Sequence, residues 1–395
     1  MVLDYYRPNV SGLSITVERL AHGLSERGHA VTVYCRSETL PTATATYRGI
    51  RLVRAPAVSG RALGTVSHVT TSMLHAAWRD RYDVLHLHAL APGLVAWMSR
   101  ALGIPTVATV HGLDWQRAKW QGMGSRVLRT GERWLVRHAH AIIAVSRDLA
   151  QYYRAEYGRE TVLIPNGTEP TTDAPLDRDW LAHVGIEPQR FFLVVARLVP
   201  EKRLEDLICA YARVDTPFPL VLVGGSSHTD SYVESLRALA AGDPRVRFLG
   251  TQPRGRLDTL YRAAAVYVHP SELEGMSIAM LQALEIGLPA VVSDIPVHRE
   301  LLGDIEGYDL FFAPRDVAAL AERLTGVLGA PLHYRQIAAR AQAHVRAAYS
   351  WEAIADRTEA LFYDVVERCG TRRVRLAAAD PLPLPPERVW PSVQE

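Results

Sequence analysis

The chain has 395 residues, a length that favours two domains, and 48% of them are hydrophobic, enough for a sizeable core in each. Lys and Arg number 44 and Asp and Glu 42, a balance that does not favour nucleic acid as the main partner. Three well separated cysteines, no signal-peptide pattern in MVLDYYRPNV and no apolar run of ~20 residues together predict a cytoplasmic chain without disulfides or membrane spans.

Short β-branched runs alternate with helical patterns along the first half of the chain. The runs are AVTVYC, IRLVRAP, DVLHLHA, PTVATVH, AIIAVS and TVLIP, at 30–35, 50–56, 83–89, 105–111, 141–146 and 161–165. Continuous apolar strands separated by helices predict a parallel sheet that is covered on both faces.

The same alternation returns in the second half. Its runs are FFLVVARL, LVLVGG, VRFLG, VYVHPS, PAVVS and DLFFAP, at 191–198, 220–225, 246–250, 266–271, 289–293 and 309–314. LIPNGTEPTTDAPLDRD, between the halves, is rich in Pro, Thr and Asp and is predicted to be the linker. We therefore predict an α/β protein of two doubly wound, Rossmann-like domains that face an interdomain cleft, with ligands beyond the carboxyl ends of the strands.

The C-terminal part differs from both halves. YSWEAIADRTEALFYDVVERC has the spacing of an amphipathic helix, whereas AAADPLPLPPERVWPSVQE is rich in Pro and is expected to be flexible. The predicted divisions are an N-terminal domain over 1–165, a C-terminal domain over 166–349, a helix over 350–370 and a tail over 371–395.

The stretch HPSELEGMSIAMLQALEIG, residues 269–287, points to a ligand site. Glu274 precedes Gly275, which permits close backbone approach, and Ser277, which can cap a helix whose N-terminus favours an anion such as phosphate. If the helix starts at Glu274, Gln282 lies ~12 Å further along its axis. That separation suits a nucleotide sugar with its sugar at Glu274 and its ribose at Gln282. An ordinary helix with an acidic first turn explains this stretch alone equally well.

Three further features favour the ligand interpretation. Arg197 at a strand end and Lys202 five residues later can together neutralise a diphosphate. A tight loop before the first helix contains Ser11 and Gly12, whose backbone amides can contact a ligand. His111 lies at the carboxyl end of a strand, where a single histidine is more often structural than catalytic.

Taken together, these residues resemble the retaining glycosyltransferases of family four, which have the GT-B fold. The resemblance runs from about residue 5 to 368. It rests on RPNVSG, ERLAHGLSERGHAVTV, VHG, AVSRDL, IPNG, ARLVPEKR, VRFLG, LYRAAAVYVHPSELEGMS, ALEIGLPAVVSDIPVHREL and SWEAIADR, in order and at family spacing. It implies an N-terminal acceptor-binding domain, a C-terminal domain that binds the nucleotide-sugar donor, and a final helix that returns to the first domain.

The resemblance also implies roles for single residues. Arg197 and Lys202 match the pair on the donor diphosphate, and Glu274 matches the first glutamate of the E-x7-E motif, which faces the donor sugar. His111 matches the histidine near donor sugar and acceptor, so these four residues would be catalytic. Further donor contacts would be Gly12, Leu249, Gly250, Gly275, Met276, Ser277 and Gln282, and acceptor contacts would be Asn9, Ser11 and His111.

Two features depart from the family. The second glutamate of the motif is replaced by Gln282, which can accept a hydrogen bond from a ribose hydroxyl but not a charge-assisted one. Glu285 lies three residues too far along to replace it, so we expect weaker or altered donor binding and retained function. The first strand has to begin at Met1, so either that strand is short or the start is late.

The chemistry expected from the resemblance is retention without a metal. A double displacement would need a second carboxylate under the anomeric carbon, and none is identified. A front-face route, in which Arg197 and Lys202 stabilise the departing diphosphate, matches the family better. DRD at 177–179 lies in the linker and HLH at 86–88 is only a weak metal candidate, so no metal and no cofactor are expected. The co-substrate would be a UDP- or GDP-sugar.

The segment WQRAKWQGMGSRVLRTGERWLVRHAH, residues 115–140, is basic and amphipathic. Its cations face a single acid, Glu132, and Trp115, Trp120 and Trp134 have roughly the spacing of one helical face. Such a segment can lie on an anionic membrane surface. A helix packed on its own domain with a solvated basic side is favoured, and peripheral attachment to the inner membrane face is the alternative.

The leading interpretation is a glycosyltransferase that moves a hexose-type sugar to a hydroxyl of a saccharide, lipid-linked or small-molecule acceptor, for example in polysaccharide biosynthesis. Nucleotide-sugar 2-epimerases share the fold but would need catalytic acids near the donor and no acceptor. A nucleotide-sugar-binding protein that has lost catalysis would explain Gln282, although the other matching residues argue against it. The sequence does not identify the base, the sugar, the acceptor or the oligomeric state.

Overall fold

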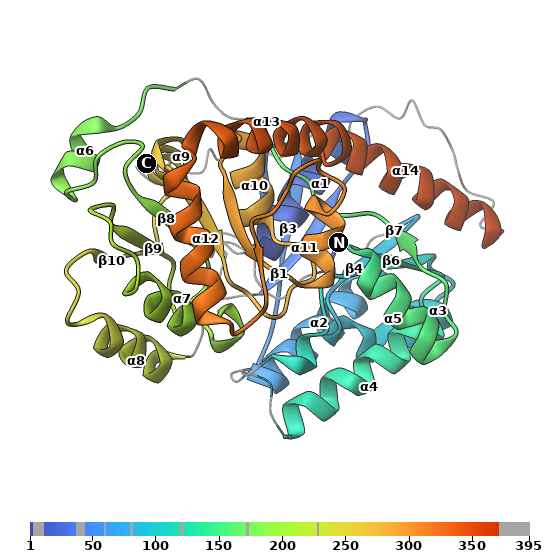
Figure 1. The fold of residues 1–395 in the computed structure, drawn as a ribbon. Helices are drawn as coiled ribbons and strands as arrows, with labels where there is room; N and C mark the ends of the chain where they lie inside the picture. Colours follow the sequence, from blue (N-terminus) through green and yellow to red (C-terminus); the bar gives the residue numbers. More distant parts are fainter. Residues whose placement is uncertain are drawn as a thin grey trace. The chain divides into compact units, whose positions relative to one another are not determined.

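The computed structural model describes residues 1–2, 12–36, 44–58, 61–79, 82–117, 120, 122–170, 174–226 and 229–370. These residues form two compact units (Figure 1). Of the described residues, unit 1 comprises those within Met1–Asn166 and Trp351–Gly370, and unit 2 those within Gly167–Ser350. The expected acceptor contacts Asn9 and Ser11, and the expected tail over 371–395, lie outside the described residues.

Unit 2 is built on six parallel strands in the order β10-β9-β8-β11-β12-β13. Their bounds are Phe192–Val195 for β8, Leu220–Val223 for β9, Val246–Gly250 for β10, Val266–His269 for β11, Ala290–Ser293 for β12 and Phe311–Phe312 for β13. The central strands are buried along almost their whole length, as expected for a parallel sheet covered on both faces. The strand order reverses between β8 and β11, and ligands of such sheets bind beyond the carboxyl ends at this switch point.

Helices cover both faces of this sheet. Their bounds are Arg178–His183 for α6, Pro200–Lys202 for η4, Leu204–Tyr211 for α7, Asp230–Ala240 for α8, Arg254–Ala263 for α9, Ile278–Ile286 for α10, Pro296–Leu302 for α11, Val317–Gly329 for α12 and Pro331–Ala348 for α13. Val194, Val268 and Val291 share a buried cluster with leucines of α7, α8 and α12. Tyr267 alternates with Val268 and packs its ring against Tyr261 of α9, with centroids 5.9 Å apart, so α9 lies on the opposite face.

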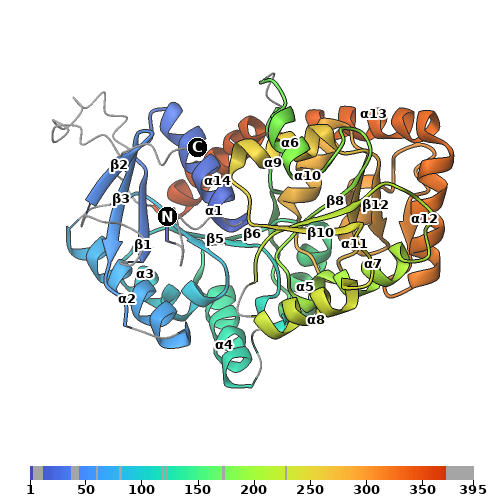
Figure 2. The same cartoon turned by 90° about the vertical axis from the view of Figure 1, so that its left-hand side faces the viewer.

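Unit 1 contains two groups of strands that are joined through Val2. The first group has the order β1 (Thr32–Arg36), β3 (Ile50–Ala55) and β2 (Thr44–Tyr47), and the second the order β4 (Leu85–His88), β5 (Thr106–Val110), β6 (Ala141–Ala144) and β7 (Val162–Leu163). Val2 pairs in parallel with both Tyr34 and Leu87. Figure 2 shows β1, β2 and β3 side by side. Strand β2, antiparallel to β3, has no counterpart among the predicted strands, because TATY is short and lacks an apolar run.

The helices of unit 1 also lie on two faces. Their bounds are Gly12–Glu26 for α1, Arg61–Arg79 for α2, Ala91–Val95 for η2, Ala96–Ala101 for α3, Asp114–Gln116 for η3, Met123–His138 for α4, Arg147–Tyr157 for α5 and Trp351–Arg368 for α14. Ala108 and Ile142 belong to a buried cluster with α2, α4 and α5, whereas Val107 and Ile143 pack with residues of α14. Successive strand residues thus point to opposite helical layers, as the alternation of a strand requires.

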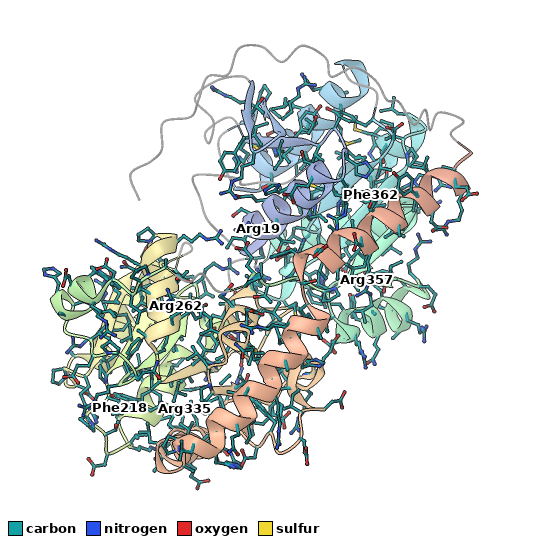
Figure 3. The ribbon with its side chains drawn as sticks, turned by 90° about the horizontal axis from the view of Figure 1, so that it is seen from above. Arg19, Phe218, Arg262, Arg335, Arg357 and Phe362 are labelled. Atoms are coloured by element: carbon teal, nitrogen blue, oxygen red, sulfur yellow. The ribbon has the colours of Figure 1, made fainter. Side chains whose placement is uncertain are left out.

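The last helix, α14, packs on unit 1 beside α1 (Figure 3). Phe362 of α14 meets the ring of His86 edge-on, with centroids 5.3 Å apart. His29, just after α1, lies 2.6 Å from the Glu359 carboxylate of α14. The two α/β, doubly wound domains predicted from the sequence are therefore confirmed. Among the described residues, no helix is long and apolar enough to span a membrane.

Candidate active site

The switch point of unit 2 brings together the loops that follow β8 and β11. Arg197 lies two residues after β8, and Lys202 ends η4 in the same loop. His269 is the last residue of β11, and Glu274 lies in the next loop. Lys202 Nζ and Glu274 Oε1 form an ion pair, and the two side chains are only 11% and 10% exposed. Two of the predicted catalytic residues are thus in direct contact.

The charged groups of this cluster control each other's ionisation. Burial by itself raises the pKa of Glu274, but the Lys202 ammonium and the hydrogen bond from His269 outweigh it and hold the pKa well below its usual range. Burial lowers the pKa of His269, and Glu274 offsets this only in part. At neutral pH the cluster is therefore a carboxylate, an ammonium and a neutral imidazole.

Hydrogen bonds fix the orientation of the His269 ring. Its Nε2 lies 2.7 Å from Glu274 Oε1 and its Nδ1 lies 3.1 Å from the Tyr267 hydroxyl. A neutral ring that donates from Nε2 to the carboxylate accepts at Nδ1 from Tyr267. His269 was given no role from the sequence, although its place at the end of a strand, five residues before Glu274, was a usable signal.

Buried neutral groups hold the loop after β11 against the end of β12. The Ser293 hydroxyl donates to the Ser271 carbonyl at 2.5 Å, and His298 Nδ1 donates to the Ser293 carbonyl at 2.7 Å. Burial, with the nearby His269, lowers the pKa of His298 to about 3, so this ring is neutral. The loop that carries Glu274 is therefore positioned without a competing charge.

Arg203 connects the two loops from the other side and was not identified from the sequence. Its backbone has φ 49°, a left-handed conformation that is uncommon for residues other than glycine. Its guanidinium bonds Asp206 at 2.8 Å and lies 3.9 Å from the Glu272 carboxylate. The Glu272 amide in turn donates to the Glu201 carbonyl at 3.0 Å. No sequence pattern marks the two contacts to Glu272, because they join residues about 70 positions apart.

The helix after Glu274 starts later than expected. Ser277 is the N-cap of α10, and its hydroxyl accepts from the Met280 amide at 3.3 Å, which confirms its predicted capping role. The residues from Glu274 to Ser277 are therefore not helical, and the separation of ~12 Å from Glu274 to Gln282, derived for a continuous helix, does not apply. Met276, a predicted donor contact, is 95% buried (5% exposed) in this loop beside Gly275.

Gln282 lies on α10, and its amide nitrogen is 3.5 Å from the Glu169 carbonyl. The side-chain oxygen therefore keeps its capacity to accept a hydrogen bond. Glu285, three residues further, is buried, and Arg346 of α13 donates to its carboxylate at 2.8 Å. This contact joins two helices and agrees with the expectation that Glu285 does not take over the position of the second motif glutamate.

Leu249 and Gly250 end β10, two strands from β8. Gly250 has φ 66°, and its carbonyl accepts from the Gly224 amide at 2.9 Å. Gly224 itself follows β9 with φ 144°, and a Cβ there would lie 1.8 Å from the Ala196 carbonyl oxygen. The backbone of Gly224 therefore packs directly on the backbone of Ala196, next to Arg197, and this close contact requires glycine at position 224.

The predicted histidine of unit 1 belongs to a stacked cluster. His111 follows β5, and its Nε2 lies 3.2 Å from His88 Nδ1, with stacked rings 5.5 Å apart. Burial lowers the pKa of His111 to about 4; Asp114 opposes this shift and Arg117 adds to it. The imidazole is therefore neutral at pH 7 and can exchange hydrogen bonds with a hydroxyl. Gly12, the predicted phosphate contact of unit 1, is the first residue of α1.

The histidines of HLH, the weak metal candidate, make a hydrogen bond and ring contacts within unit 1. His86 Nε2 lies 2.7 Å from the Thr109 hydroxyl, and the rings of His86 and His88 are 4.1 Å apart. Burial lowers the pKa of both histidines well below the usual value. Over the part of the chain that the structure describes, no three His, Cys, Asp or Glu side chains are grouped as metal ligands.

The segment over 115–140 does not form one helix. Trp115 lies in η3, Trp120 precedes the helix, and α4 starts only at Met123. The expected helical face of tryptophans is therefore wrong, because only Trp134 of the three lies on α4. Glu132 is not a surface acid among the arginines either: it is fully buried, and Trp115 Nε1 donates to it at 3.0 Å.

Two family models match the chain, one over each half. Residues 10–172 match the family model described as Glycosyltransferase Family 4, and residues 178–344 match that of Glycosyl transferases group 1. The alpha-maltose-1-phosphate synthase of Mycobacterium tuberculosis is 28% identical over 383 residues, which cover 91% of this chain and 97% of that protein. The D-inositol 3-phosphate glycosyltransferase of Geodermatophilus obscurus is 27% identical over 397 residues, which cover 91% and 86%.

Solved structures share the fold. Sucrose-phosphate synthase from Thermosynechococcus elongatus has a TM-score of 0.80 at 22% identity and covers 93% of this chain and 99% of its own. Anabaena HepE in complex with UDP and glucose has a TM-score of 0.76 at 18% identity and covers 92% and 98%. These likenesses support the GT-B arrangement of two Rossmann-like domains.

Proposed function

The chain belongs to glycosyltransferase family 4, and on that premise we propose that it is a retaining enzyme that uses a nucleotide-sugar donor. It moves a hexose-type sugar to a hydroxyl of a saccharide, lipid-linked or small-molecule acceptor. The observation that carries the proposal is the ion pair between Lys202 and Glu274 at the switch point of unit 2. Doubly wound sheets bind their ligands at this place, and family resemblance assigns the same two residues to the donor.

The ion pair suits a site that receives a diphosphate. A diphosphate at Lys202 replaces Glu274 as the partner of the ammonium, with Arg197 as the second cation. Glu274 is then a carboxylate with lone pairs available for the hydroxyls of the donor sugar. His269 keeps donating to this carboxylate, so its orientation does not depend on Lys202. The Lys202 ammonium thereby exchanges one negatively charged partner, the Glu274 carboxylate, for another, the diphosphate.

Retention is proposed to follow a front-face route. Glu274 is held by Lys202 and His269, and the other acid of this loop, Glu272, pairs with Arg315 at 2.8 Å, so no second carboxylate is assigned as a nucleophile. Charge stabilisation of the leaving diphosphate by Arg197 and Lys202 then supplies most of the rate. His111 acts as a neutral hydrogen-bonding group toward the donor sugar and the acceptor, because its pKa is lowered to about 4.

We propose a UDP- or GDP-sugar as donor, without a metal requirement. HepE, which shares the fold, has been solved with UDP-glucose, and a starch synthase IV of Arabidopsis thaliana with ADP and acarbose. Leu249 and Gly250, at the end of β10, are proposed to contact the base of the nucleotide donor. Activity that persists in EDTA supports the metal-free proposal, whereas strict dependence on added magnesium contradicts it.

The lysines allow a direct test of donor binding. The sequence contains only two, Lys119 and Lys202. Reductive methylation with ¹³C labels both lysines and the N-terminal amine, and Lys119→Arg and Lys202→Arg assign the two lysine signals. A panel of UDP-, GDP-, dTDP- and ADP-sugars is then added. One donor that shifts the Lys202 signal, leaves the Lys119 signal in place and slowly releases its nucleotide supports the transferase.

Other outcomes separate the alternatives. A shifted Lys202 signal without nucleotide release, even with candidate acceptors, supports a binding protein that has lost catalysis. Conversion of the donor sugar to its 2-epimer, without an acceptor, supports the epimerase. No shift of the Lys202 signal with any donor contradicts the proposed donor site.

A further inference from the structure

Unit 1 contains a pocket of about 220 Å³ that none of the proposed roles uses. Its lining comes from η3, α4 and α5, on the face of the sheet that also carries α2. Trp115 of η3 and Tyr152 and Tyr157 of α5 contribute aromatic walls. The charged groups come from α4 and from one position of α5. The pocket is built entirely within unit 1.

Glu132 places a buried oxygen at this pocket that has no partner. The residue has no exposed surface. Its Oε2 accepts from Trp115 Nε1 at 3.0 Å. Its Oε1 has no described partner within hydrogen-bonding distance, although the hydroxyls of Tyr152, Tyr153 and Tyr157 are near enough to stabilise the carboxylate. A buried acceptor without a hydrogen bond costs about 1–3 kcal/mol, so a native protein normally completes it with a side chain, an ordered water or a ligand. Glu132 Oε1 can therefore accept a further hydrogen bond from a molecule in the pocket.

The backbone of α4 holds Glu132 in this position. A Cβ on the preceding Gly131 would lie 2.6 Å from the Leu90 carbonyl oxygen, and one on Gly93 of η2 would lie 2.1 Å from the Gly131 oxygen. Helix α4 and η2 therefore touch backbone to backbone and cannot shift freely. Because Glu132 follows Gly131 directly, this contact holds the backbone of Glu132 in place.

The charges of the pocket favour an uncharged ligand. Arg129 and Arg133 carry two positive charges, and Glu132 and Glu156 two carboxyl groups. The Arg129 guanidinium lies 4.0 Å from the centre of the Trp115 ring, where it makes a cation–π contact and is already engaged. Burial also raises the pKa of Glu132, and the neighbouring indole and hydroxyl groups offset this only in part. A charged ligand of either sign would be attracted by one pair of these groups and repelled by the other.

Size and chemistry narrow the ligand further. The pocket is smaller than the ~300 Å³ at which sites for drug-sized ligands begin, so it has room for one ring. Half-buried tyrosines offer apolar ring surface and hydroxyls together, and Glu132 and the arginines offer acceptors and donors. A ring with an apolar face and several hydroxyls matches this lining, and that description fits a pyranose.

We propose that this pocket binds one neutral pyranose unit, with a sugar hydroxyl donating to Glu132 Oε1. Trp115 lies four residues after His111, so one short segment of chain connects the pocket to the candidate catalytic histidine. The pocket and its unpartnered oxygen are independent of the proposed function, whereas the choice of a sugar as the ligand rests partly on it. The site thus provides unit 1 with a saccharide contact outside the reaction centre.

The test is direct binding to the full chain without any nucleotide sugar. Methyl glucopyranoside, methyl galactopyranoside and methyl mannopyranoside are titrated by ligand-observed NMR and calorimetry, with glucuronate and choline as charged probes. A monosaccharide of this size is expected to bind with a Kd of about 1 mM, from ~0.3 kcal/mol per non-hydrogen atom. At least one neutral pyranoside should bind, and more tightly than either charged probe.

Variants locate the binding. Glu132→Gln should weaken it about tenfold, because the charge-assisted bond becomes a neutral one. Glu160→Gln removes an exposed carboxylate of the same unit, paired only with Arg154, and should leave binding unchanged. Tyr152→Leu removes one wall and should also weaken binding, which keeps the test decisive if Glu132→Gln misfolds. Thermal unfolding of each variant establishes that it is folded.

Three results would overturn the proposal. The first is that no pyranoside binds at ~50 mM, far above the expected Kd. The second is that Glu132→Gln and Tyr152→Leu both bind the pyranoside as tightly as the parent chain. The third is that glucuronate or choline binds more tightly than every neutral pyranoside. The Lys202 NMR signal of the same sample reports the donor site separately. A pyranoside that binds while no nucleotide sugar shifts that signal would contradict the proposed function and leave the pocket proposal intact.

Discussion

Glu274 in unit 2 and Glu132 in unit 1 are both buried carboxyls, but their neighbours differ. Glu274 meets an ammonium and an imidazole, and its pKa lies well below the usual range. Glu132 meets an indole N–H and a group of tyrosines, and its pKa is raised. A buried carboxyl retains its charge where a cation is buried with it, whereas neutral donors alone do not fully replace water.

The difference separates two kinds of site. Glu274 and Lys202 are each neutralised by the other, so the cluster suits a ligand that brings its own opposite charge. Glu132 has no cation in contact within the described residues and keeps one oxygen unpartnered. Its pocket suits a ligand that brings hydrogen-bond donors and no charge.

The largest effect is expected from Lys202→Met. Loss of the ammonium leaves Glu274 buried without its cation, which raises the pKa of Glu274 and costs ~3 kcal/mol of the free energy of unfolding. Loss of charge stabilisation on the leaving diphosphate lowers kcat ~100- to 1,000-fold. Urea unfolding and nucleotide release measure the two effects. Lys119→Met is the control, and equal activity of both variants would remove Lys202 from the mechanism.

Replacing each glutamate by glutamine should shift stability in opposite directions. The folded pKa of Glu274 is lowered, so its stabilisation is present above the unfolded value of about 4.5 and is lost as pH falls through the folded pKa. The folded pKa of Glu132 is raised, so its contribution is lost as pH rises from about 4.5 through the folded pKa. At pH 7, Glu274→Gln should therefore destabilise and Glu132→Gln stabilise the chain.

The measurement is the free energy of unfolding of both variants and the parent chain from acid to neutral pH. Glu274→Gln should lose the decline on the acid side, and Glu132→Gln should lose the decline toward neutral pH. Parallel pH curves for the two variants would contradict the opposite surroundings assigned to these carboxyls.

His111→Ala extends the comparison to neutral groups of unit 1. Because the pKa of His111 is about 4, its ring stays neutral from about pH 5 to 8, and activity should show no ionisation of this residue there. Loss of one hydrogen bond, ~1.4 kcal/mol, should lower kcat/KM about tenfold. His183→Ala, at the exposed end of α6, is the control. A pH profile whose midpoint near 6.5 vanishes in His111→Ala would contradict the neutral role.

The smallest effect is expected from Gln282→Glu. A carboxylate strengthens a hydrogen bond from a ribose hydroxyl by ~1 kcal/mol, which corresponds to about fivefold tighter donor binding. Titration of the donor measures the Kd, and Gln282→Ala serves as the matched variant without an acceptor. If all three side chains give the same Kd, Gln282 does not contact the donor.

Strand positions were predictable because burial dictates composition. Each of the twelve β-branched runs overlaps a strand, and among the described residues only β2, which is not apolar, was missed. Lys202, Glu274 and Ser277 were also singled out, since cations, acids and caps at strand and helix ends have recognisable patterns. Arg203, His269 and the pocket at Glu132 were not assigned roles.

Sequence by itself determined the α/β alternation, the family and the motif residues of the two units, because periodicity and short-range spacing specify local structure. Only the tertiary structure decided which charges meet. The same residue type became a paired carboxylate at position 274 and an incompletely bonded one at position 132. The physical reason is that ionisation depends on desolvation and on neighbours brought from distant positions, such as Lys202 for Glu274, and neither is encoded in local sequence pattern.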